Sequence, residues 1–101
     1  QDWESLQRIA AQWVERDQRN SEAWLALGKA YHHVSDGAGA VRALQESTRL
    51  APRNAEGWYY LGRAYAALKQ LDGLTESLRN LDMLNSTSAR TLRELLNTLT
   101  Q

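Results

Sequence analysis

The chain has 101 residues, 43% hydrophobic and 24% charged, a composition typical of one globular domain and not of a disordered segment. Twelve basic and twelve acidic residues give a net charge of zero, so no strong positive field draws nucleic acid to the chain. No apolar run approaches the roughly 20 residues of a membrane span. We therefore expect no nucleic-acid partner and no membrane insertion.

The chain contains no cysteine, which excludes disulfides and thiolate metal sites and leaves the compartment undetermined. It begins with Gln1 rather than Met and shows no signal-peptide pattern, so we expect a processed product or a piece of a longer protein. We expect a soluble protein and favour the cytoplasm over the periplasm. Ten arginines against two lysines indicate a bacterial, GC-rich genome.

Helices are expected nearly throughout, because the chain has one proline and no segment with the alternation of a strand. Asp2 is the predicted N-cap of the first helix, Asn20 or Ser21 that of the second, and Ser86-Thr87-Ser88 caps the last. Pro52 marks the end of the third helix. The predicted helices cover residues 2–16, 22–33, 38–50, 55–68, 71–85 and 89–100.

The sequence repeats itself after 34 residues. Residues 24–31 read WLALGKAY and residues 58–65 read WYYLGRAY, with tryptophan, glycine and tyrosine in matching positions. Chance does not place bulky, small and aromatic residues in matching positions, so the repeat predicts an architecture of stacked units.

This pattern resembles the tetratricopeptide repeat (TPR), which has Trp, Leu-Gly, Tyr, a small residue, a large apolar residue, a small residue and Pro in this order. Residues 21–54 fill every position, with Trp24, Leu27-Gly28, Tyr31, Ala40, Leu44, Ser47 and Pro52. Residues 55–88 fill most of them, with Trp58, Leu61-Gly62, Tyr65 and Leu78, while Leu74, Leu81 and Ser86 depart from the pattern.

The resemblance implies an all-α fold, a right-handed α-solenoid of antiparallel helix pairs with about six helices, in one domain over residues 1–101. Residues 2–16 resemble the second half of a repeat that lacks its first helix, with Leu6, Ala10 and Trp13 in its small, large and small positions. Residues 89–101 resemble a C-terminal capping helix with Leu96 in the glycine position.

The resemblance also implies a non-catalytic scaffold that binds a peptide or a partner helix in a concave groove lined by the first helix of each repeat. We expect the cations of this groove to contact acidic side chains or a C-terminal carboxylate. The alternative is that they are ordinary solvated charges. The predicted groove residues, at inward positions outside the core, are Leu25, Lys29, His32, Tyr59, Arg63, Arg93 and Asn97.

Within this groove Lys29, Arg63 and Asn97 lie 34 residues apart and are expected to form a ladder, joined by Arg93. Leu25 and Tyr59 are expected to supply an apolar floor. TPR proteins that bind the Glu-Glu-Val-Asp tail of chaperones use a Lys/Asn clamp, whose positions here carry Leu25, Lys29 and Tyr60. We therefore expect no binding to such tails.

An alternative function is self-association through the uncapped N-terminal helix. Trp3 and Trp13 are large aromatic residues on a helix without its expected mate, and an apolar end of a repeat array needs a cover. A second copy of the chain, sequence outside this segment, or inward packing of Trp13 against the layer of Trp24 would supply it.

We expect no catalysis, no metal and no cofactor. His32 and His33 are adjacent, so their side chains diverge by about 100° on a helix and cannot share a metal ion. Gly37-Ala38-Gly39 lacks the strand and the Lys-Ser/Thr of a phosphate-binding loop.

Overall fold

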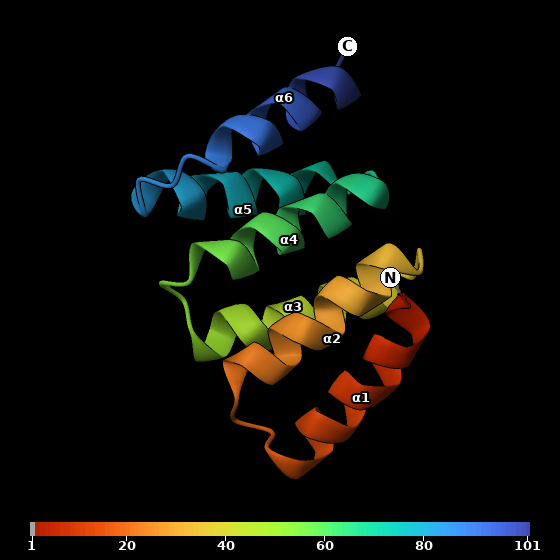
Figure 1. Ribbon diagram of the computed structural model, residues 1–101. Coiled ribbons are helices and arrows are strands. Elements are labelled where there is room, and N and C mark those ends of the chain that lie inside the picture. Colours follow the sequence, from red (N-terminus) through yellow and green to blue (C-terminus); the bar gives the residue numbers. More distant parts are fainter. Residues whose placement is uncertain (1) are drawn as a thin grey trace.

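The computed structural model describes residues 2–101, and in that part of the chain all regular structure is helical (Figure 1). Turns of three to five residues join the helices, so consecutive helices run antiparallel. The predicted all-α architecture of six helices is confirmed, with every boundary within two residues. The helices are α1 (Trp3–Arg16), α2 (Ser21–His33), α3 (Gly37–Leu50), α4 (Ala55–Ala67), α5 (Leu71–Met83) and α6 (Ala89–Leu99).

Short polar side chains set the start of most helices. The Asp2 carboxylate accepts the backbone N–H of Ser5 at 3.0 Å, as predicted, and Asn20 rather than Ser21 caps α2. Asp36 and Asn54 cap α3 and α4 in the same way. The predicted serine cap of α6 is wrong, because Ser88 bonds the Ser86 hydroxyl and makes no side-chain bond to the helix.

The helices stack in chain order, with α1 and α6 at opposite ends (Figure 1). Helix α2 packs on α3 and α4 packs on α5, forming two hairpins. Helices α2, α4 and α6 also contact one another in sequence, whereas α3 and α5 do not touch within the described residues. The stack is therefore curved, with α2, α4 and α6 on its inner face and α3 and α5 on its outer face.

The 34-residue repeat of the sequence reappears as repeated contacts. The indole N–H of Trp24 donates to the carbonyl of Gln18 at 2.9 Å, and that of Trp58 donates to the carbonyl of Pro52 at 2.8 Å. Donors and acceptors are each 34 residues apart. Each tryptophan thus fastens its helix to the turn that precedes it while its ring packs in the core.

Two glycines allow the closest helix contacts. A Cβ atom on Gly28 would overlap the fully buried side chain of Leu44, and one on Gly62 would overlap Leu92, which is also fully buried. The leucine side chains fill the space that each glycine leaves. Close approach, rather than an unusual backbone angle, is the reason for glycine here, because neither has a positive φ.

We predict that Gly28→Ala lowers the free energy of unfolding by about 1–3 kcal/mol, because overpacking outweighs the roughly 1 kcal/mol gained in helix propensity. Urea unfolding of the variant measures the change. Gly37→Ala is the matched control, since its new Cβ would meet Leu68, a partly exposed side chain that is free to move. A Gly28→Ala variant as stable as the control would show that the helices have room to separate.

The turns after α2 and α4 also repeat, with Ser35 at φ 66° and Lys69 at φ 58°. Both lie in the left-handed region, which L-residues with a Cβ adopt at a cost of roughly 1–2 kcal/mol. The turns close with the same hydrogen bond, from the N–H of Asp36 to the carbonyl of Tyr31 and from Gln70 to Tyr65, each 2.9 Å long. Glycine would meet the requirement of this turn without the strain.

Lys69→Gly is therefore expected to raise the free energy of unfolding by about 0.5–1 kcal/mol, less than the strain relieved because glycine also frees the unfolded chain. Thermal or urea unfolding checks this, with Lys69→Ala as a control that keeps the strained φ. Equal stabilities of the two variants would contradict the explanation.

Candidate binding groove on the concave face

Arg63 lies at the centre of the inner face, on α4. Its guanidinium carbon lies 5.6 Å from the ring centre of Tyr59 and 5.7 Å from that of Tyr60. Within the described residues no carboxylate lies within ion-pair distance of it. Cation–π contacts hold the group while leaving its N–H donors available to a ligand.

Lys29 on α2 is bound to Glu56 on α4, with Nζ 2.9 Å from the carboxylate oxygen. The same ammonium lies 5.1 Å from the ring centre of Tyr60. Both partners are partly exposed, so the pair contributes little to stability, of the order of 0–1 kcal/mol. The hydrogen bond to Glu56 raises the pKa of Lys29, which stays charged, and an acidic ligand would have to compete with Glu56 for it.

Two of the predicted groove residues are placed differently from expectation. Leu25 is only 3% exposed and packs in the core with Leu44 and Leu61, so the expectation that it lies outside the core is wrong. Arg93 donates two hydrogen bonds, of 2.8 and 2.9 Å, to the carboxylate of Asp82 on α5. These bonds hold the guanidinium against α5, the outer helix of the preceding pair, so Arg93 does not join the predicted ladder.

The inner face contains a cavity of about 260 Å³ between α2, α4 and α6. Its wall is mostly apolar, and Arg63 and His32 stand at its polar side. Asn97 is exposed on α6 but does not contribute to the wall. The lining residues are His32, Arg63, Ala66, Ala67, Leu95, Thr98 and Leu99.

The three α6 residues of this wall were missed by the sequence reasoning. Leu92, Leu95, Leu96 and Leu99 recur along α6 at helical spacing, and the buried Leu92 forms a core cluster against which the other three pack. The core covers only part of this row of leucines. Leu92 is fully buried, whereas Leu95 and Leu99 remain partly exposed toward the groove.

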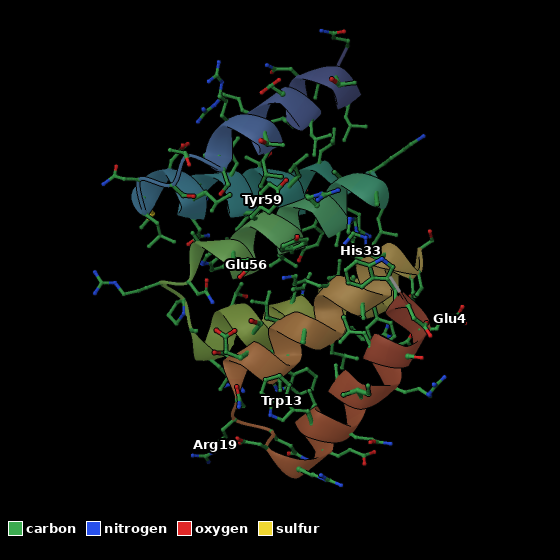
Figure 2. All side chains as sticks on the ribbon, viewed as in Figure 1. Glu4, Trp13, Arg19, His33, Glu56 and Tyr59 are labelled. Carbon is green, nitrogen blue, oxygen red and sulfur yellow. The ribbon has the colours of Figure 1, made fainter. Side chains whose placement is uncertain are left out.

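Figure 2 shows the aromatic and charged side chains along this face, with Glu56 and Tyr59 on α4 and His33 at the end of α2. Tyr59 packs edge-on against Tyr60, and His32 packs edge-on against Tyr60 from the neighbouring helix. Of the predicted groove residues, the structure thus brings together Lys29, His32, Tyr59 and Arg63.

The predicted self-association residues differ in their surroundings. Trp3 stacks on His33 of the same chain, with ring centres 3.9 Å apart and planes at 14°. Trp13 is 41% exposed on α1, so it does not fold inward completely. Ile9, one turn before Trp13, is 62% exposed and was not predicted as part of this surface.

His32 and His33 take up protons less readily than free histidine. Burial lowers the pKa of His32 below its ordinary value of 6.5, and the positive charge of Arg63 lowers it further. The pKa of His33 is lowered by burial first and then by Arg63 and Lys29. Folding therefore disfavours a positive charge on these two histidines.

We predict that stability falls as the pH drops below 6.5, the ordinary pKa of histidine. In that window the unfolded chain binds protons that the folded histidines still resist, so protonation favours unfolding. Urea unfolding at pH 7.5 and pH 5.5 measures the loss, and the double variant His32→Gln/His33→Gln should show a smaller one. Asp2 and Glu46, whose pKa values are lowered from 3.8 and 4.5, titrate below this window.

No helix of the described residues 2–101 is both long and apolar enough to cross a lipid bilayer. Over the same range no three histidine or acidic side chains come together in a group that could hold a metal ion.

A solved structure provides the decisive comparison. A chain from the TPR2B-domain:pHsp70 complex of yeast Sti1 superposes with a TM-score of 0.85 over 99% of this chain and 84% of its own length. The chain has the fold of a tetratricopeptide-repeat domain. The two sequences are 16% identical, so the likeness concerns the fold alone.

No protein-family model and no curated protein matches the sequence. A TPR domain can tolerate this degree of divergence, because its packing constrains only a few positions in each 34-residue unit. Those positions in this chain are the tryptophans, glycines and leucines whose contacts are described above.

Proposed function

We propose that this TPR domain is a protein-interaction module whose concave groove binds a peptide or helix of a partner protein carrying both acidic and apolar side chains. The single observation that carries the proposal is the position of Arg63, a cation with free donors at the edge of an apolar cavity on the inner face.

The two halves of this site fit two parts of one ligand. The cavity of about 260 Å³ suits an apolar side chain, whose full burial contributes roughly 1.5–3 kcal/mol. A hydrogen bond from Arg63 to a carboxylate contributes roughly 1.5–3 kcal/mol. Since Lys29 already binds Glu56, Arg63 is the first cation that an acidic group would meet without displacing an internal partner.

The aromatic side chains support this assignment. Tyr59 and Tyr60 hold the Arg63 guanidinium between them, which limits the conformational entropy that it loses when a ligand binds. Tyr59 is only partly buried, so its ring also offers apolar surface to the ligand. The role proposed is binding and not catalysis.

The pHsp70 named in the complex of the Sti1 domain is not the ligand that we propose here. Position 25 carries a buried leucine and Lys29 is paired with Glu56, so neither supplies a free polar group to a chaperone tail. The proposed partner is described only by its chemistry, an acidic segment with an apolar side chain.

We predict that Arg63→Glu weakens binding by about tenfold to a hundredfold. This range corresponds to the loss of one charge-assisted hydrogen bond. Peptides selected on the immobilised wild-type domain from a displayed random library serve as ligands. Their affinities for both proteins are measured by fluorescence anisotropy.

Arg42→Glu, an exposed arginine on the outer helix α3, is the matched control and should leave affinity unchanged. The selected peptides should be enriched in acidic and large apolar residues. Selection that enriches no peptide, or peptides that bind Arg63→Glu as tightly as wild type, would refute the groove as the binding site.

A further inference from the structure

Two cations of the inner face lie close to the same aromatic ring. The ammonium of Lys29 lies 5.1 Å from the ring centre of Tyr60, and the guanidinium carbon of Arg63 lies 5.7 Å from it. A ligand with two acidic side chains would therefore meet both cations. The cations differ in their internal partners. Glu56 binds Lys29 at 2.9 Å, while no carboxylate of the described residues lies within ion-pair distance of Arg63.

The 34-residue repeat explains this difference. Lys29 and Arg63 occupy the same position of the repeat, and so do Glu22 and Glu56. Lys29 on α2 is paired with the acidic residue at the start of the next inner helix, α4. The corresponding partner of Arg63 would stand at position 90, at the start of α6, where the sequence has Arg90. The start of α6 thus offers Arg63 no carboxylate.

Glu56 holds Lys29 in the way that a ligand carboxylate would (Figure 2). The side chains of Glu56 and Lys29 are 48% and 30% exposed, so a peptide in the groove can reach the pair. A ligand carboxylate that took Lys29 would break one ion pair to form another, and the charge of Glu56 would remain beside it. A ligand cation that took Glu56 would free Lys29 in the same way. An uncharged ligand residue therefore fits this place best.

We infer that Glu56 is a specificity-determining residue of the groove: it acts as an internal ligand of Lys29 and excludes peptides that place a second acidic side chain there. The inference rests on the proposed function, because it takes the groove as a peptide site in which Arg63 binds the first acidic side chain. The preferred partner segment carries an acidic residue beside its apolar side chain and an uncharged residue where it passes Lys29.

Glu22 is the other acidic residue that acts on Lys29. The hydrogen bond to Glu56 is the main cause of the raised pKa of Lys29, and the charge of Glu22 is the smallest contribution. Because Glu22 lies two turns before Lys29 on the same helix, it is the residue that would replace Glu56 as a partner. The test therefore includes a variant that lacks both carboxylates.

Peptides from a displayed random library are selected in parallel on the immobilised wild type, Glu56→Gln and the double variant Glu22→Gln/Glu56→Gln. Glu46→Gln is the matched control, since Glu46 forms an ion pair of the same length, 2.9 Å, with Arg49 on the outer helix α3. Circular dichroism checks that each variant folds. Affinities are measured by fluorescence anisotropy.

Peptides selected on the wild type and on Glu46→Gln should carry the acidic residue that depends on Arg63. Those selected on the variants without Glu56 should carry one acidic residue more. That residue should improve affinity about fivefold for these variants, the upper end for a partly exposed ion pair, and give the wild type no gain. Adding Lys29→Gln should abolish the improvement, and a peptide with glutamine in place of the extra acidic residue should bind all proteins equally.

The inference is overturned if neither variant without Glu56 selects an additional acidic residue, or if that residue helps the wild type as much. Wild-type peptides with a basic residue that Glu56→Gln no longer selects would also overturn it, because Glu56 would then bind the ligand itself. In these cases peptides that depend on Arg63 leave the proposed function standing. Selection that enriches no peptide on any of the proteins overturns both.

Discussion

The structure depends on the close approach of neighbouring helices at Gly28 and Gly62. Each glycine leaves a space that one fully buried leucine fills, Leu44 beside Gly28 and Leu92 beside Gly62. Because protein interiors are packed as densely as organic crystals, a methyl group added at either position has nowhere to go. The spacing of the helices, and hence the curvature of the inner face, follows from these two contacts.

The curvature determines what the inner face can do. Helices α2, α4 and α6 lie along one side of the stack, which brings side chains from three separate helices around one cavity. Arg63 stands at its edge between two tyrosines, with its donors free, while the neighbouring Lys29 and the more distant Arg93 are neutralised by Glu56 and Asp82. Of these three cations, Arg63 is therefore the one that a ligand can bind without displacing an internal carboxylate.

The first and last helices of the stack differ in how they use their apolar side chains. On α1, Ile9 and Trp13 are exposed. On α6, Leu95, Leu96 and Leu99 pack against the core that α4 and α5 form, and Leu95 and Leu99 also line the cavity of the inner face. Helix α6 therefore covers the core and shapes the groove with the same side chains.

The sequence alone determined the helices, their antiparallel order and the TPR architecture, because a 34-residue period places tryptophan, glycine and tyrosine where only stacked pairs can use them. The resemblance to the TPR also implied that Lys29, His32, Tyr59 and Arg63 share one face, since it assigns the groove to the first helix of each repeat. The tertiary structure alone decided that Leu25 is core, that Arg93 binds Asp82, and that Leu95, Thr98 and Leu99 line the cavity. These facts depend on distances between helices that are far apart in the chain, and periodicity within one helix carries no information about them.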